Sequence, residues 1–276
     1  MEIYLWTIAA LGAAAVCLII YRVFGLGFYG EEYSLCETGT CATIGAREIQ
    51  ADAYGIVEEE DGLMAVLADG MGNSYGGKIA SRIAVEVFED VFHDSSAFYN
   101  PQYYFRKAFH AANREILECL DGERGAASVA AVMIKGRKLY YASAGGVKIA
   151  VYRNHELVPV TSGHTIDALA KQKYKEGKLA RQTAVSLLEK HRIYNYVGQD
   201  GFRDIEFFDV PISLYGGEYV VLLSDGMYEG VSWKEMEECL EKRGSCEEKA
   251  LELTEKINAM IEEGADNASI VILRVI

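Results

Sequence analysis

Proline and basic side chains are scarce in this sequence of 276 residues. Only 3 Pro stand against 27 Gly, and 50% of the residues are hydrophobic, which excludes a disordered, collagen-like or low-complexity chain. Lys and Arg total 27 against 41 Asp and Glu, and the resulting formal net charge of −14 repels nucleic acid. The sequence therefore predicts a protein with a large core and no nucleic acid as its partner.

Paired thiols and metal-binding histidine patterns are also missing. The six cysteines include no CxxC pair, and no histidine stands at metal-ligand spacing. A chain of this length needs no disulfide for stability, so we expect reduced thiols, which suit a cytoplasmic domain. These residues are Cys17, Cys36, Cys41, Cys119, Cys239 and Cys246.

One long hydrophobic run lies at the N-terminus, where no charged side chain occurs between Ile3 and Tyr21. About 19 residues at roughly 1.5 Å per residue approach the thickness of the hydrocarbon core of a bilayer. Glu2 stands where a signal peptide would be basic, and no small-residue cleavage site follows before Gly30. We therefore predict a transmembrane helix over residues 1–24, with a cleaved signal peptide and a buried core helix as alternatives.

The rest of the chain predicts a tether and one folded domain. Residues 25–39 contain several glycines and are expected to form a linker. Residues 40–276 contain neither an internal repeat nor a Pro/Ser-rich break, so we expect one domain. Arg22 after the hydrophobic run, together with the reduced thiols, favours a single-pass protein of the cell membrane whose domain is cytoplasmic.

The pattern of short apolar runs predicts an α+β fold. Lys135-Gly136-Arg137 and Gly145-Gly146 join such runs too tightly for a crossover helix, so both are expected to be hairpin turns of a largely antiparallel sheet. Ser232 and Glu235 form a capping box at the start of a helix. Strands are predicted at residues 53–57, 63–68, 129–134, 138–143, 147–152, 219–224 and 268–275, and helices at 79–91, 103–120 and 247–263.

Acidic residues stand at the ends of several predicted strands. Two apolar runs lead into Asp69-Gly70-Met71 and Asp225-Gly226-Met227, while Asp52 and Asp266 each stand shortly before a strand. Carboxylates that converge repel one another unless they hold protons or a cation, and oxygen ligands without His or Cys favour Mg²⁺ or Mn²⁺. Asp-Gly is also a common turn dipeptide, so ordinary turns are the alternative.

Four motifs resemble the PPM (type-2C) family of metal-dependent serine/threonine protein phosphatases, in its bacterial membrane-anchored form. The most specific is Ala68-Asp69-Gly70-Met71-Gly72-Asn73-Ser74-Tyr75-Gly76-Gly77-Lys78-Ile79-Ala80-Ser81. The others are Arg47-Glu48-Ile49-Gln50-Ala51-Asp52, Ser224-Asp225-Gly226 and Asp266-Asn267. Their order and spacing agree with the family from Gly45 to Val275.

The resemblance implies a sandwich of two antiparallel β-sheets flanked by helices, with two Mn²⁺ or Mg²⁺ ions at one end. Asp69 would bridge both ions, Asp225 and Asp266 would complete one, and Asp52 with the Gly70 carbonyl would bind the other. Arg47 would bind the substrate phosphate. The implied activity is hydrolysis of phosphoserine and phosphothreonine in phosphoproteins by metal-activated water, carried out by a monomeric catalytic domain.

Departures from the family pattern leave a second interpretation open. Gly146 stands where the family has an aspartate that anchors a third metal, and Ala51 replaces a polar side chain. A catalytically weak or inactive phosphatase-like binding module at the membrane is therefore the alternative. His164 is either a general acid or a structural residue.

The segment from Lys171 to Arg192 is basic in an otherwise acidic chain. It corresponds to the variable flap beside the active site of the family, where it could dock an acidic phosphoprotein. An ordinary solvated pair of amphipathic helices is the alternative.

Overall fold

The computed structural model describes residues 36–72, 75–188, 192–260 and 264–276. The predicted transmembrane segment, residues 1–24, and most of the predicted linker lie outside these ranges. Within them, no helix combines the length and hydrophobicity that crossing a bilayer requires. The division of the chain at residues 24 and 39 stays a prediction, although the first described strand already begins at Cys36.

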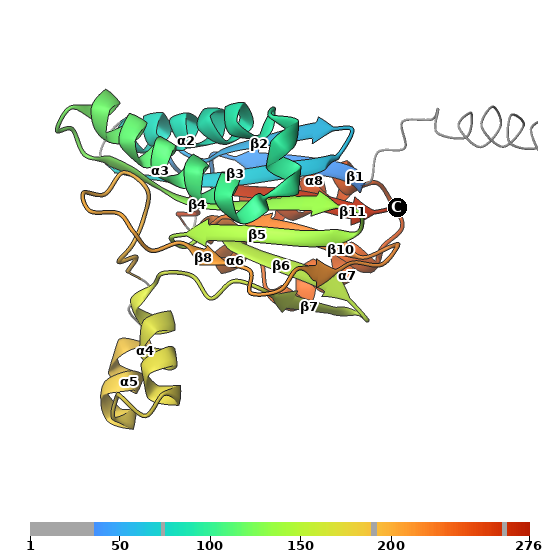
Figure 1. Cartoon of the computed structure of the whole chain (residues 1–276). Coiled ribbons are helices and arrows are strands. Elements are labelled where there is room, and N and C mark those ends of the chain that lie inside the picture. Colours follow the sequence, from blue (N-terminus) through green and yellow to red (C-terminus); the bar gives the residue numbers. More distant parts are fainter. Residues whose placement is uncertain (1–35, 73–74, 189–191, 261–263) are drawn as a thin grey trace, which may run out of the picture. The chain divides into compact units, whose positions relative to one another are not determined.

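Two antiparallel sheets form the centre of the fold (Figure 1). The first sheet has the strand order β1 (Cys36–Thr43), β11 (Ala268–Val275), β10 (Tyr219–Leu223), β6 (Lys148–Arg153) and β7 (Glu156–Pro159). The second has the order β2 (Ala53–Glu59), β3 (Gly62–Gly72), β4 (Gly125–Lys135), β5 (Lys138–Ala144) and β8 (Glu206–Phe207), and β9 (Ile212–Ser213) also pairs with β5. The predicted α+β class and the two antiparallel sheets are confirmed.

Helices cover the outer faces of both sheets. The second sheet is covered by α2 (Gly76–Phe92) and α3 (Pro101–Leu120), with the short 3₁₀ helix η1 (Ser95–Tyr99) beside them. The first sheet is covered by α6 (Asp225–Gly230), α7 (Trp233–Glu241) and α8 (Cys246–Asn258). A further pair, α4 (Ile166–Lys175) and α5 (Arg181–Leu187), overlaps the basic segment, and the two helices contact each other. We refer to this pair as the flap.

The layers explain why β3 is hydrophobic without alternation. Leu63 and Leu67 pack between the two sheets, whereas Met64 and Val66 pack against the helical layer, so both faces of the strand are buried. The helical layer is rich in aromatic side chains, and the rings of Phe88 and Phe109 meet edge to face at 5.0 Å between centroids. This packing holds β3 rigidly along the length that leads to Asp69.

The prediction of a hairpin at Gly145-Gly146 is wrong. The preceding strand, β5, belongs to the second sheet, whereas β6 pairs with β10 and β7 in the first. This turn therefore carries the chain from one sheet to the other. Gly145 has a φ of +111°, and a Cβ atom there would lie 2.5 Å from the Ser128 side chain. The glycine pair correctly indicates a tight turn, but it does not indicate which strands the turn joins.

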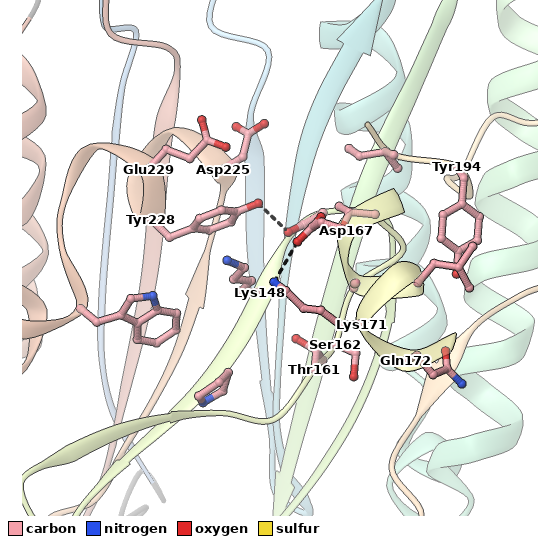
Figure 2. A pocket seen from close by; sticks show the side chains of 18 of the residues that line it. Lys148, Thr161, Ser162, Asp167, Lys171, Gln172, Tyr194, Asp225, Tyr228 and Glu229 are labelled. Carbon is pink, nitrogen blue, oxygen red and sulfur yellow. Dashed lines mark hydrogen bonds and ion pairs between the residues drawn. The ribbon is translucent and has the colours of Figure 1, made fainter. Parts of the chain in front are cut away.

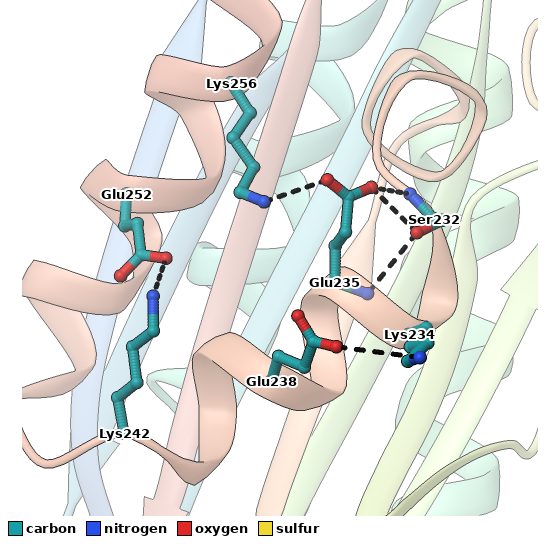
Figure 3. Close-up of polar contacts among 7 residues, drawn as sticks. All are labelled: Ser232, Lys234, Glu235, Glu238, Lys242, Glu252 and Lys256. Atoms are coloured by element: carbon teal, nitrogen blue, oxygen red, sulfur yellow. Dashed lines mark hydrogen bonds and ion pairs between the residues drawn. The ribbon is translucent and has the colours of Figure 1, made fainter.

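The capping box at Ser232 and Glu235 is present at the start of α7 (Figure 3). The Ser232 backbone N–H donates to the Glu235 carboxylate over 3.1 Å, and the Glu235 N–H donates to the Ser232 hydroxyl over 3.3 Å. Glu235 also accepts from Lys256 of α8 over 2.9 Å. Its carboxylate thus caps one helix and joins it to the next.

Candidate metal centre

The four aspartates singled out from the sequence lie together at one end of the two sheets. Asp52 immediately precedes β2 and Asp69 lies within β3, while Asp225 begins α6 and Asp266 stands two residues before β11. The negative charges of Asp225, Asp52 and Asp266 all act on Asp69, so the four side chains are neighbours. The strand β3 continues to Gly72, so Asp69 is within the strand and not in a turn after it.

Burial and mutual repulsion perturb the pKa values of these carboxyl groups. Asp69 is 8% exposed, and burial raises its pKa well above the ordinary value, with the charges of Asp225 and Asp52 adding to the effect. Burial raises the pKa of Asp52 to about 6, partly opposed by the nearby hydroxyls of Ser269 and Ser224. Burial and the charge of Asp266 also raise the pKa of Asp225.

Within the cluster, two buried carboxylate oxygens lack a hydrogen-bond donor among the residues that the structure describes. They are Oδ2 of Asp52 and Oδ2 of Asp69. A buried carboxylate oxygen without a donor is strongly unfavourable, and a divalent cation satisfies it. Because the set consists of carboxylates, it fits the hard cations Mg²⁺ and Mn²⁺. The role of Asp52, Asp69, Asp225 and Asp266 as ligands stays a prediction.

Arg47, the predicted phosphate-binding residue, forms an ion pair with Asp266. Its Nε lies 2.7 Å from Oδ1 and its Nη2 lies 2.5 Å from Oδ2, so the guanidinium binds both carboxylate oxygens. In this arrangement, the described Asp, Glu, His and Cys residues form no group of three that could hold one ion. Because Arg47 engages both oxygens of Asp266, a metal ion bound by Asp266 would compete with this ion pair.

Asn267 fastens the loop that carries Arg47 and Asp52. Its Oδ1 accepts from the Ala51 N–H over 2.9 Å, and its Nδ2 donates to the Ile44 carbonyl over 2.8 Å. The residue is 7% exposed, so both hydrogen bonds are shielded from water. The sequence motif included Asn267, but no pattern indicated that it joins loops more than 200 residues apart along the chain.

Close backbone contacts explain the glycines that follow the two aspartates. A Cβ atom on Gly70 would lie 2.2 Å from the Gly77 carbonyl oxygen and 2.5 Å from that of Ala51. A Cβ atom on Gly226 would lie 2.0 Å from the Asn267 carbonyl oxygen. Only glycine allows these backbone segments to approach so closely. The role of the Gly70 carbonyl as a metal ligand stays a prediction.

His164 has a structural position. Its Nδ1 accepts from the Gly145 N–H over 3.2 Å, so the ring proton is assigned to Nε2. The residue is 8% exposed, and its ring packs edge to face on Tyr194. Burial lowers the pKa of His164 below its ordinary value. These contacts favour the structural interpretation, in which His164 fixes the turn between the two sheets.

Replacement of His164 by asparagine is expected to alter how stability depends on pH. The pKa is lowered in the folded state, so the neutral ring stabilises the fold above about pH 6.5, and this contribution is lost as the pH falls through the lowered pKa. Asparagine retains an acceptor for the Gly145 N–H but does not titrate. Urea unfolding at pH 5.5 and 7.5 should show a smaller loss on acidification in His164→Asn than in the wild type. Equal losses would contradict this role.

A cleft of about 870 Å³ opens beside the carboxylate cluster, and Asp225 belongs to both (Figure 2). The start of β6, the flap helix α4 and the short helix α6 contribute to its walls. Gly146 also lines it, where its carbonyl accepts from the Tyr228 hydroxyl over 3.2 Å. Lys148 was not singled out from the sequence, although it is the one charged residue in the predicted strand 147–152 before Arg153. Other residues of the wall are Thr161, Asp167, Lys171 and Glu229.

Comparison with known proteins identifies related sequences. A family model described as protein phosphatase 2C matches residues 42–262. The serine/threonine phosphatase stp of Listeria monocytogenes is 26% identical over 236 residues, covering 82% of this chain and 90% of that protein. The protein phosphatase PhpP of Streptococcus pneumoniae is 28% identical over 178 residues, covering 63% of this chain and 70% of that protein.

Solved structures share the fold. The serine/threonine phosphatase of S. agalactiae superposes with a TM-score of 0.76 at 24% identity, covering 87% of this chain and 100% of that chain. The catalytic domain of the phosphatase PstP, in complex with 2 manganese ions, gives a TM-score of 0.69 at 20% identity, covering 87% of this chain and 98% of that chain. Because the family model matches most of its length, the chain belongs to the protein phosphatase 2C family.

Proposed function

We infer that this protein is a serine/threonine protein phosphatase that hydrolyses phosphoserine and phosphothreonine in proteins. Membership of the protein phosphatase 2C family and the named phosphatases among its relatives support this activity. The observation that carries the chemistry is the pair of buried, donor-free oxygens on Asp52 and Asp69, next to Asp225 and Asp266, in the described part of the chain. Substrates are therefore phosphoproteins.

In the proposed site, Asp52, Asp69, Asp225, Asp266 and the Gly70 carbonyl hold two Mn²⁺ or Mg²⁺ ions. Such ions supply a deprotonated water and neutralise charge on the phosphoryl oxygens. The buried carboxylate of Asp69 is fixed by a strand that is packed on both faces. The exposed guanidinium of Arg47 stands at the rim of the cluster and, once released from Asp266, binds phosphate oxygens as a planar fork.

The apolar run from Ile3 to Tyr21 supports a membrane anchor. We propose a single-pass protein of the cell membrane with a cytoplasmic, monomeric phosphatase domain. Cell fractionation followed by alkaline carbonate extraction tests the anchor, and recovery of the full chain in the supernatant would contradict it. Labelling of Cys119, an exposed free thiol, by an impermeant reagent in intact cells would contradict the cytoplasmic placement.

A phosphatase-like binding module is the second candidate function. It is favoured by the glycine at position 146 and by the ion pair that occupies Asp266 with Arg47. This candidate predicts binding of a partner without hydrolysis.

Metal-dependent hydrolysis decides between the two functions. The purified full chain should hydrolyse p-nitrophenyl phosphate and a phosphothreonine peptide in Mn²⁺, and excess EDTA should abolish both activities. In Asp69→Asn, kcat should fall by roughly 10³-fold, which corresponds to about 4 kcal/mol of activation free energy. Lys234→Gln, on the exposed face of α7, is the control and should retain the wild-type rate. Equal rates in the wild type and in Asp69→Asn would refute the phosphatase.

A further inference from the structure

The cleft beside Asp225 contains a lysine that forms no ion pair with a carboxylate in the described part of the chain. Lys148 begins β6 and is partly buried, and no described carboxylate lies within 4.0 Å of its ammonium group. The ammonium lies 3.5 Å from the centre of the Tyr228 ring and 5.9 Å from that of Trp233. Burial is the main factor that lowers the pKa of Lys148. A partly desolvated cation in an open cleft is well placed to bind an anion.

A second ammonium group reaches the same space from the flap. Lys171 of α4 lines the cleft and pairs with Asp167 over 3.1 Å. Its positive charge lowers the pKa of Lys148, so the two ammonium groups are close enough to repel each other, as their positions in Figure 2 show. The charges of Asp167, Glu229 and Asp225 raise the pKa of Lys148 in turn, and Asp167 is itself paired with Lys171. An anionic group held between the two lysines would relieve the repulsion.

One end of the cleft is acidic, and the end at the flap carries Lys171 together with its partner Asp167. Asp225 and Glu229 lie side by side at one end, away from Lys171 and Gln172 on the flap helix (Figure 2). Asp225 belongs to both the carboxylate cluster and the cleft. A phosphoryl group bound at the cluster would therefore lie next to the space in front of Lys148. A ligand that fills the cleft therefore presents its phosphoryl group at one end and a second anionic group at the other.

We propose that this cleft binds the stretch of substrate next to the phosphorylated residue, and that Lys148 and Lys171 select an anionic side chain there. The second anionic group is a carboxylate or a second phosphate, because an ammonium group binds both. The inference rests on the proposed phosphatase activity and adds to it the class of sequence preferred. Because Lys148 lies in a strand and Lys171 in the flap, the flap completes the subsite.

The test compares kcat/KM for three phosphothreonine peptides in Mn²⁺, using the full chain. The peptides are identical except that the residues flanking the phosphothreonine are glutamate, glutamine or phosphoserine. The wild type should favour the glutamate peptide over the glutamine peptide by about tenfold, the factor given by about 1.4 kcal/mol of binding free energy. Comparison of the phosphoserine peptide with the glutamate peptide then shows which anion the subsite prefers. A higher kcat/KM for either of these two peptides than for the glutamine peptide supports the subsite.

Variants assign the preference to the two lysines. Lys148→Met keeps the apolar stem and removes the charge. The ratio of kcat/KM for the glutamate peptide to kcat/KM for the glutamine peptide should therefore fall to near one. Lys171→Met removes the second charge, at a side chain that is 59% exposed, and should also lower this ratio. Lys173→Met is the matched control on the same helix, because Lys173 pairs with Glu176 and does not line the cleft, and it should keep the wild-type ratio.

Two results would overturn the inference while leaving the phosphatase intact. One is a wild type that hydrolyses the three peptides equally well. The other is a preference that survives in both Lys148→Met and Lys171→Met. If the wild type hydrolyses neither the peptides nor p-nitrophenyl phosphate, the proposed function itself fails, and the inference fails with it.

Discussion

Asp225→Asn should abolish phosphatase activity while stabilising the metal-free protein. The amide lacks the charge that a divalent ion requires, so kcat should fall by roughly 10³-fold. Burial and the charge of Asp266 make the negative charge of Asp225 unfavourable in the absence of metal. The same change removes this charge and so reduces the repulsion among the buried carboxylates. Thermal unfolding in EDTA should show a higher melting temperature, by about 2–4 °C for each 1 kcal/mol relieved.

The control for this variant is Asp200→Asn, at an exposed aspartate outside the cluster. It removes one negative charge from the protein surface and should change neither activity nor melting temperature appreciably. A large drop in the melting temperature of metal-free Asp225→Asn would mean that Asp225 stabilises the start of α6 instead of binding metal.

Gly226→Ala should both destabilise the protein and inactivate it. The new methyl group would lie 2.0 Å from the Asn267 carbonyl oxygen, and backbone atoms cannot yield as a flexible side chain does. We expect a loss of about 3 kcal/mol in the free energy of unfolding. The strain also pushes α6 away from the loop that carries Asp266, and displacements of about 1 Å reduce catalysis by about 10²-fold.

Gly216→Ala provides a matched comparison. Gly216 is not in the left-handed region of φ, and the nearest atom to an added Cβ would be 3.9 Å away. The free energy of unfolding of Gly216→Ala, measured in urea, should therefore stay within about 0.5 kcal/mol of that of the wild type. Similar losses in the two alanine variants would show that close packing at Gly226 is not the reason for its glycine.

The parts of the fold that depend on local pattern could be predicted from the sequence. The strand at residues 268–275 has the predicted bounds, and the hairpin at 135–137 joins β4 to β5 as expected. The capping box at Ser232 was readable because its two side chains are three residues apart. The motif order indicated the sandwich, and the four aspartates it singled out lie together in the structure.

What the sequence could not supply depends on long-range geometry. The turn at Gly145-Gly146 has the composition of a hairpin, but only the pairing of β6 with β10 shows that the chain changes sheets there. The pairing of Arg47 with Asp266 joins residues 219 positions apart, beyond any local pattern. The sequence does not single out Lys148, because its position in a cleft depends on α4 and α6, which enclose the space in front of it.

The placement of β11 has a consequence for biosynthesis. This last strand lies between β1 and β10, and it pairs with β1 along all of Cys36 to Thr43. During synthesis, β1 and one edge of β10 therefore stay unpaired, and the first sheet cannot form completely until β11 itself has been made. Asp266 arrives in that same closing stretch, so a nascent chain carries no complete carboxylate cluster. Assembly of the four carboxylates into one cluster therefore depends on the pairing of β11 with its two neighbours.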